Sequence, residues 1–297
     1  MATLRVPRNI HINLIHADTL LHDFERIYDV VVGNPPYKKL TNNKKLLAAY
    51  KKGLRNQSTN NLFAFFIEKV LRVGHFVSLI VPKSLINAPE FNLTRELLKE
   101  SKISYLFDFG EKGFKGVKIE TVCFIVENGV LPSETVVESY ITESNRVIEQ
   151  AYFTDARFPY WLPYRDNDFD QVAEHMTFNI FTAFRDRSLT NNNTQQAGRY
   201  RVLKSRNIEN NQIIDIPGYD RYVNSVEGLA IGRFLNDSSA ILVPNLTYNP
   251  RACRLPENCI ADGSVAVLKL IDAEQEITDA DLDRVEGVAV TGRIPAN

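Results

Sequence analysis

The sequence predicts an α/β protein made of part of a doubly wound, Rossmann-like sheet followed by a mixed α+β region. The first observation is the β-branched run Val30–Val32, which stops at Pro35 and Pro36. The second is the alternation of strand and helix patterns across residues 62–126. The third is the turn-rich stretch 127–133, after which one more strand leads into a differently composed region.

Length and composition describe a soluble, globular chain. With 297 residues and 44% hydrophobic content, it is long enough for one large or two medium domains. No apolar run approaches the roughly 20 residues of a membrane helix, so we expect no membrane partner. The net charge of -1 neither indicates nor excludes a nucleic-acid partner, because clustering of charge matters more than the total.

The cysteine content favours a reducing, cytoplasmic compartment. The three cysteines, Cys123, Cys253 and Cys259, do not make an even set for disulfides. Cys253 and Cys259 lie close in sequence without a histidine at metal-ligand spacing, so we expect buried thiols and no metal site.

Residues 9–20 hold the first expected element. Ile10, Ile12 and Leu14 alternate with polar residues, which predicts a strand, and Asp18 follows its end. On its own, Asp18 also fits the cap of a short helix after that strand.

Residues 28–37 are expected to form a rigid polar corner. The valines favour a strand covered on both faces, and the prolines end it because neither can donate to a sheet ladder. The carboxamide of Asn34, the carbonyl of Pro35 and the ring of Tyr37 then lie at the carboxyl end of a strand, where open α/β sheets bind ligands. As bare sequence, Asn-Pro and Pro-Pro are also ordinary turn residues.

Residues 38–61 carry seven basic side chains and no acidic one. Such a cluster beside the corner predicts contacts with a phosphate backbone, and a solvated loop or helix face is the alternative. The seven residues are Lys38, Lys39, Lys44, Lys45, Lys51, Lys52 and Arg55.

The following segment supplies the alternation of elements. Apolar residues at helical spacing predict a helix from Leu62 to Leu71, and a second helix is expected after Pro89. Strands are expected over 76–81, 103–109, 121–126 and 135–141.

These elements carry motifs in a known order. Asn34-Pro35-Pro36-Tyr37 resembles the motif of methyltransferases that transfer a methyl group from S-adenosylmethionine to an exocyclic amine. Across residues 9 to about 128 the order of runs is similar to that of the γ-type N6-adenine DNA methyltransferases of restriction-modification systems. The runs are Asn61-Leu62-Phe63, Val81-Pro82-Lys83-Ser84, Phe107-Asp108-Phe109-Gly110-Glu111, Phe114 and Thr121-Val122-Cys123.

The resemblance implies a cofactor, a substrate and residue roles. S-adenosyl-L-methionine would supply the methyl group, and double-stranded DNA would supply an adenine flipped out of the duplex. Asn34 and Pro35 would accept hydrogen bonds from the adenine amino group, and Pro36 would complete this catalytic corner. Tyr37 and Phe114 would stack on the base. Without the resemblance, Phe114 is an exposed loop aromatic that fits a partner contact equally well.

The cofactor half of the expected site is incomplete. The resemblance implies that Asp18 binds the cofactor adenine, and that a glycine-containing turn and another acidic residue lie upstream. Here 17 residues precede Asp18, and they contain no glycine. We therefore expect residues 1–145 to be the C-terminal part of a split or truncated methyltransferase catalytic domain, with the missing strands supplied by a second chain or lost.

Residues 146–297, after a boundary expected near 145 to 165, resemble an incomplete target-recognition domain of restriction-modification methyltransferases. Lys204 and Arg206 end a stretch of alternating basic and apolar residues, which puts cations on one strand face as DNA contact requires. An ordinary half-exposed strand is the alternative. The residues from Asp272 onward are acidic and at most weakly helical.

Three functions remain open from the sequence. The first is a site-specific adenine N6-methyltransferase, the modification component of a restriction-modification system. The second is methylation of a protein glutamine or an RNA base, because the same corner serves those substrates. The third is a non-catalytic DNA-binding specificity module or an inactive fragment, which the missing cofactor strands favour.

Overall fold

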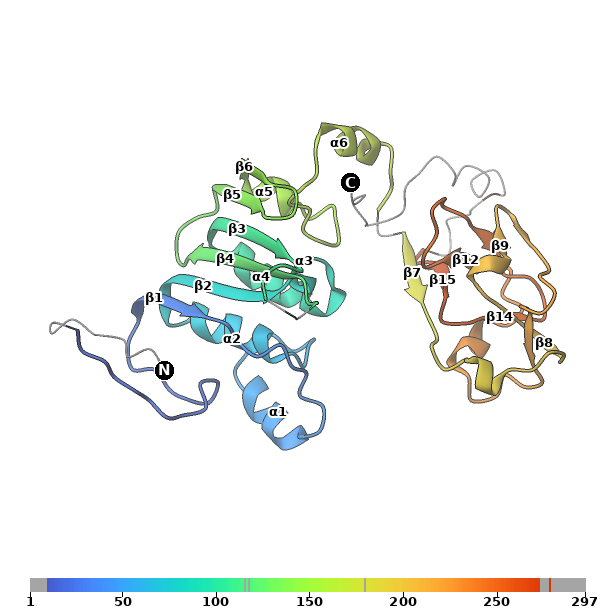
Figure 1. The fold of residues 1–297 in the computed structure, drawn as a ribbon, viewed down its shortest axis with the longest axis horizontal. Helices are drawn as coiled ribbons and strands as arrows, with labels where there is room; N and C mark the ends of the chain where they lie inside the picture. Colours follow the sequence, from blue (N-terminus) through green and yellow to red (C-terminus); the bar gives the residue numbers. More distant parts are fainter. Residues whose placement is uncertain (1–9, 115, 117, 179, 273–277, 279–297) are drawn as a thin grey trace. The chain divides into compact units, whose positions relative to one another are not determined.

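The structure is a computed structural model that describes residues 10–272 and residue 278, apart from residues 115, 117 and 179. The chain forms two compact units that divide between Met176 and Thr177 (Figure 1). Each unit has its own hydrophobic core.

A six-stranded sheet is the centre of the first unit. Its strands lie in the order β1-β2-β4-β3-β5-β6, where β1, β2, β3 and β5 run parallel and β4 and β6 run in the opposite direction. The α/β class predicted for this part is confirmed. The strands are β1 Tyr28–Gly33, β2 Gly74–Pro82, β3 Lys102–Gly110, β4 Thr121–Glu127, β5 Glu134–Ser139 and β6 Ser144–Glu149.

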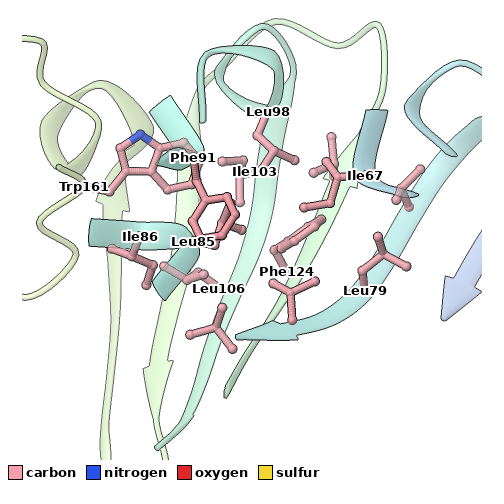
Figure 2. Packing of buried hydrophobic residues seen from close by; sticks show 14 of the residues in the cluster. Ile67, Leu79, Leu85, Ile86, Phe91, Leu98, Ile103, Leu106, Phe124 and Trp161 are labelled. Carbon is pink, nitrogen blue, oxygen red and sulfur yellow. The ribbon is translucent and has the colours of Figure 1, made fainter. Parts of the chain in front are cut away.

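Helices close the core of this unit through their apolar faces. Helix α2, Leu62–Leu71, buries Phe63 and Ile67, which share one cluster with Leu79 of β2 and Phe124 of β4 (Figure 2). This is the helix that the apolar spacing predicts. The other helices are α1 Lys44–Lys51, α3 Ser84–Asn87, the 3-10 turn η1 Pro89–Phe91, α4 Asn92–Lys99, α5 Gln150–Phe153 and α6 Asn167–Glu174.

Strand β1 lies at one edge of the sheet and is covered on one face, which corrects the expectation that it is covered on both. Val31 packs against the core, whereas Val30 is 60% exposed and Val32 is 73% exposed. The strand expected within residues 9–20 is also absent, because a strand needs a hydrogen-bonded partner and residues 10–17 have none among the described strands. Ile10, Ile12 and Leu14 are consequently exposed.

The first unit extends past the boundary expected at 145 to 165. Strand β6 pairs with β5, and Trp161 lies in the core beside Ile86 and Phe91 (Figure 2). The Gln150 side chain accepts a hydrogen bond from the Ile103 amide at 2.7 Å and donates one to the Ser101 carbonyl at 3.0 Å. These contacts, between residues distant in sequence, hold the segment after β5 against the sheet. Sequence composition does not reveal such contacts, so it placed the boundary too early.

The second unit is built from short strands. A four-stranded sheet in the order β13-β12-β15-β7 and a three-stranded sheet in the order β11-β8-β14 carry its core. Among its described residues the helical elements are 3-10 turns. The α-helices of the region expected to be α+β, residues 146–297, are α5 and α6, and both belong to the first unit. The strands are β7 Phe181–Phe184, β8 Tyr200–Leu203, β9 Ile208–Glu209, β10 Gln212–Ile213, β11 Arg221–Val223, β12 Ile241–Pro244, β13 Cys253–Arg254, β14 Cys259–Ala261 and β15 Val265–Leu270. The turns are η2 Asn191–Asn193, η3 Ser205–Asn207 and η4 Ala230–Phe234.

Within the described part of the chain, no helix combines the length and apolar character needed to cross a membrane. The acidic stretch that begins at Asp272 lies almost entirely outside the described residues.

Candidate active site

The parallel strands of the first unit bring the predicted site residues to one edge of the sheet. Strands β1, β2, β3 and β5 all end there, because they share one direction. The corner after β1, Lys83 after β2 and the Asp108–Phe114 stretch at the end of β3 therefore lie along this carboxyl edge. Ligands of open α/β sheets bind at this edge.

The corner presents two acceptors without a hydrogen-bond donor among the described residues. Pro35 is buried, whereas Asn34 and Pro36 are exposed. Among the hydrogen bonds of the described residues, none engages the Asn34 carboxamide or the Pro35 carbonyl. A fixed proline thus anchors a turn whose polar atoms remain available to a ligand.

Tyr37 is held from three sides. Its hydroxyl donates to the Ile80 carbonyl at 3.1 Å, and its ring meets that of Phe63 edge to face, with centroids 6.5 Å apart. Burial raises the pKa of Tyr37, and the nearby Cys123 thiol adds to the shift. The Leu62 amide also donates to the Lys38 carbonyl at 2.9 Å, which fixes the chain immediately after the ring.

Phe114 lies across from Tyr37. The two ring centroids are 6.5 Å apart, with an angle of 63° between the ring planes. The loop that carries Phe114 packs tightly at Gly113, where a Cβ atom would come within 2.3 Å of the Thr121 hydroxyl. The structure therefore brings together the two aromatic residues that the sequence pairs, although they are far apart in the chain.

A buried polar cluster supports this loop, and the sequence analysis did not identify it. The Asp108 carboxylate accepts hydrogen bonds from the Gly110 amide at 2.9 Å and the Tyr164 hydroxyl at 2.9 Å, and it pairs with the Lys83 ammonium at 2.8 Å. Burial is the main cause that raises the pKa of Tyr164, and the Asp108 carboxylate adds to it. An aspartate within the otherwise apolar run Phe107–Phe109 was the available signal.

Asp18 is already engaged within the protein. Its Oδ1 accepts a hydrogen bond from the Leu20 amide at 3.0 Å, and its Oδ2 accepts one from the Tyr50 hydroxyl at 2.6 Å. Burial and then the Asp18 carboxylate raise the pKa of Tyr50 to about 12. Asp18 thus caps a local turn, as the simpler reading expects, although residues 19–21 form no helix.

The predicted DNA-contacting lysines of the first unit differ in their surroundings. Lys39 forms an ion pair of 2.8 Å with Glu90, whereas Lys38, Lys44 and Lys45 are exposed. Helix α1, which carries Lys44 and Lys45, buries none of its residues. These exposed ammonium groups are therefore the better candidates for a phosphate contact.

In the second unit, Lys204 and Arg206 both lie over the ring of Tyr219, at 4.6 and 4.9 Å from its centroid. Arg201, on the same stretch, is instead held by Asp215 and Asp220. The alternating pattern thus places one cation inside the unit and two others together at an aromatic ring.

Cys253 and Cys259 are buried free thiols, as expected. Burial, with a smaller contribution from Cys259, raises the pKa of Cys253 to about 12. The described residues contain no group of three or more His, Cys, Asp or Glu side chains placed to hold a metal ion.

Comparison with known proteins gives a family match for the first unit. Residues 8–114 match the family model described as Eco57I restriction-modification methylase. The type II methyltransferase M.BsuBI of Bacillus subtilis is 28% identical over 177 residues, which cover 56% of this chain and 34% of that protein. The chain thus spans about a third of this relative's length, and the predicted resemblance to restriction-modification methyltransferases is confirmed.

Two solved structures share a distant likeness with the chain. The type IIL restriction-modification enzyme MmeI in complex with DNA gives a TM-score of 0.48 at 12% identity, covering 82% of this chain and 41% of that one. The type IIG restriction endonuclease BpuSI gives a TM-score of 0.41 at 15% identity, covering 83% of this chain and 42% of that one.

Proposed function

We propose that the first unit is the target-base half of a site-specific DNA adenine N6-methyltransferase, the modification component of a restriction-modification system. The observation that carries the proposal is the pairing of two unused acceptors, on Asn34 and Pro35, with the rings of Tyr37 and Phe114 at the carboxyl edge of the sheet. The match of residues 8–114 to a restriction-modification methylase family supports it.

The corner suits an exocyclic amine because it offers two hydrogen-bond acceptors and needs no nucleophilic side chain. The lone pair of the adenine amino nitrogen is delocalised into the ring, which makes the nitrogen a poor nucleophile. The Asn34 Oδ1 and the Pro35 carbonyl would each accept one N–H of that amino group and favour a more tetrahedral nitrogen, whose lone pair is available. No cysteine nucleophile is required, and Cys123 is partly buried with its pKa raised by that burial.

The two rings would hold the base once it leaves the duplex. An enzyme that modifies an amino group engaged in base pairing must extrude the nucleotide, at a cost of a few kcal/mol. Stacking against Tyr37 and Phe114 would offset part of that cost. Fixation of Tyr37 by Ile80 and Phe63 keeps its ring in place before the base arrives.

The proposed methyl donor is S-adenosyl-L-methionine, which supplies an electrophilic methyl group when bound. Among the described residues the one candidate contact for it is Asp18, each of whose carboxylate oxygens accepts one hydrogen bond within the protein. The unpaired backbone edge of β1 is where further strands would extend the sheet. Val30 and Val32 also leave one face of β1 exposed. We propose that a polypeptide segment that pairs with this edge supplies the cofactor-binding strands.

Double-stranded DNA is the proposed partner of both units. In the first, Lys38, Lys44 and Lys45 would contact phosphates beside the corner. In the second, which would act as the target-recognition domain, Lys204 and Arg206 would do the same.

The substitution Asn34→Ala tests this function in the enzyme reconstituted with its cofactor-binding segment. We expect transfer of labelled methyl groups to DNA to fall at least about 100-fold, in line with the loss of one preorganised hydrogen-bonding group, while DNA affinity is unchanged. Nucleoside analysis of the product should show N6-methyladenine. Retained transfer, or label in cytosine, RNA or protein glutamine, would contradict the proposal.

A non-catalytic DNA-binding module is the second candidate, and the open edge of β1 favours it. The two differ in one outcome. A chain that binds DNA but gains no transfer activity with any cofactor-binding segment from the same system would be such a module.

A further inference from the structure

The loop between β12 and β13 presents its apolar side chains to solvent. Leu246 is 73% exposed and Tyr248 is fully exposed, although the flanking Pro244 and Ala252 are buried. A single exposed apolar residue needs no explanation, but two at the tip of one anchored loop indicate a contact surface.

The loop is anchored at its base, so its tip is displayed in a defined place. The Asn245 side chain donates to the Gly263 carbonyl at 3.0 Å, and the Asn245 amide donates to the Ser264 carbonyl at 3.0 Å. At the tip, the Thr247 hydroxyl donates to the Asn249 carbonyl at 2.6 Å, which holds the turn between Leu246 and Tyr248.

Ser264, which holds the base of this loop, also contacts the segment that carries the two cations at Tyr219. The Ser264 hydroxyl accepts a hydrogen bond from the Ser205 amide at 3.0 Å, and Ser205 lies between Lys204 and Arg206. Ser264 is itself held by Asp262, whose Oδ1 accepts its amide at 2.8 Å. The base of the β12–β13 loop, at Asn245, and the Lys204–Arg206 segment, at Ser205, therefore both contact Ser264.

This neighbourhood joins positive charge to an exposed ring. Lys204 and Arg206 both lie over the Tyr219 ring, and no ion pair is present for either within the described part of the second unit. Two cations without an acidic partner among these residues favour an anionic polymer over a neutral protein surface. The exposed Leu246 stands on a loop whose base contacts the same serine, and leucine is one of the apolar side chains that DNA-binding proteins insert between base steps. Tyr248 adds a ring that can stack on a base.

We propose that Leu246 and Tyr248 form a wedge that inserts into the base stack of duplex DNA while Lys204 and Arg206 hold the adjacent phosphates. The proposal rests on DNA as the substrate of the proposed function and names how the second unit engages it. The cations supply salt-sensitive affinity, and the wedge supplies stacking that salt screens little.

Fluorescence anisotropy of the full chain separates these two contributions. The probes are a labelled mixed-sequence duplex and the same duplex with one abasic site, each titrated over a range of salt concentrations. Because unstacking is already complete at an abasic site, we expect the wild-type chain to bind that duplex more tightly. Tyr248→Ala should weaken binding to the intact duplex at least about fivefold, abolish the abasic preference and leave the salt slope unchanged.

Matched variants make the result specific. Tyr248→Phe keeps the ring and should retain both affinity and abasic preference. Lys204→Gln with Arg206→Gln should lower the salt slope by about 2 and keep the abasic preference. Leu131→Ala, which alters an 83% exposed leucine in the first unit, should change nothing.

The outcomes distinguish this inference from the function on which it rests. If the wild-type chain shows no salt-dependent binding to either duplex, both DNA as the substrate and the wedge are wrong. If it binds but Tyr248→Ala keeps its affinity and abasic preference, the wedge alone is wrong.

Discussion

Asp108 ties the Phe114 loop to the rest of the first unit. Its carboxylate is buried and engages Gly110, Lys83 and Tyr164, which come from three separate segments of the chain. Loss of one partner of such a group leaves a buried polar atom unsatisfied, which costs more than the hydrogen bond is worth on balance. The position of the loop is therefore coupled to the stability of this cluster.

Tyr164→Phe tests the cluster without a change of side-chain volume at the ring. We expect the free energy of unfolding to fall by about 1.5 to 3 kcal/mol, because a hydrogen bond to a buried carboxylate is lost. Urea denaturation followed by circular dichroism measures it. Tyr140→Phe, at an exposed position, is the matched control and should change stability by less than about 0.5 kcal/mol. Equal effects of the two variants would show that the cluster contributes nothing.

Site residues that are adjacent in the sequence could be predicted from it, and site residues brought together from distant segments could not. The corner 34–37 was visible in the sequence because its four residues are adjacent and follow a strand pattern. The cluster at Asp108 was not visible as a cluster, since Tyr164 is 56 positions away and belongs to a segment predicted to lie outside this unit.

At the scale of elements, Asp155 holds the loop between α5 and α6 together through Arg157 and Arg165. Hydrogen bonds from Arg157, with a further one from Arg165, lower the pKa of Asp155 from 3.8 to about 2. A carboxyl group with a lowered pKa in the folded state stabilises it above pH 3.8, and this stabilisation disappears as the pH falls through about 2.

Asp155→Asn should therefore destabilise the protein at neutral pH, with a difference from wild type that shrinks between pH 4 and pH 2. Urea denaturation at a series of pH values measures this difference. A difference that stays constant over the range, or grows as the pH falls, would contradict the role assigned to Asp155.

The lysines of helix α1 are expected to affect the salt dependence of DNA binding. Lys44→Gln with Lys45→Gln should lower the slope of log affinity against log salt by about 2, because both ammonium groups are exposed and proposed to contact phosphates. Lys39→Gln should change the slope less, since Glu90 already neutralises Lys39. Anisotropy titrations provide the slopes, and a larger change for Lys39→Gln would reverse the assignment.

Elements with a local pattern were predicted well, and elements that depend on partners were not. Helix α2 and strands β2, β3 and β4 follow the expected ranges closely, because apolar period and proline punctuation define them. The strand expected near Ile12 failed because strand formation needs a neighbouring strand. The covered faces expected for β1 were only half right: Val31 packs against the core, whereas Val30 and Val32 point to the other face, which no described element covers.

At the scale of the whole molecule, the two units give the chain two kinds of surface. The first holds the proposed base pocket at the carboxyl ends of its parallel strands. Strand β1 is the outermost strand of that sheet, and its outer side is unpaired among the described residues. The second holds a cation pair at Tyr219 and an exposed aromatic loop. We propose that these surfaces bind the acceptor base and DNA, and that strands paired with the edge of β1 hold the cofactor.

Titration calorimetry of S-adenosylmethionine into the purified chain tests that account most directly. We predict no saturable binding heat, because Asp18 is internally engaged and the open edge of β1 lacks its neighbouring strands. The same preparation should bind duplex DNA in a salt-dependent manner, which verifies that it is folded and competent. Saturable binding of S-adenosylmethionine with a micromolar dissociation constant would contradict the account, because the chain would then hold both halves of the site.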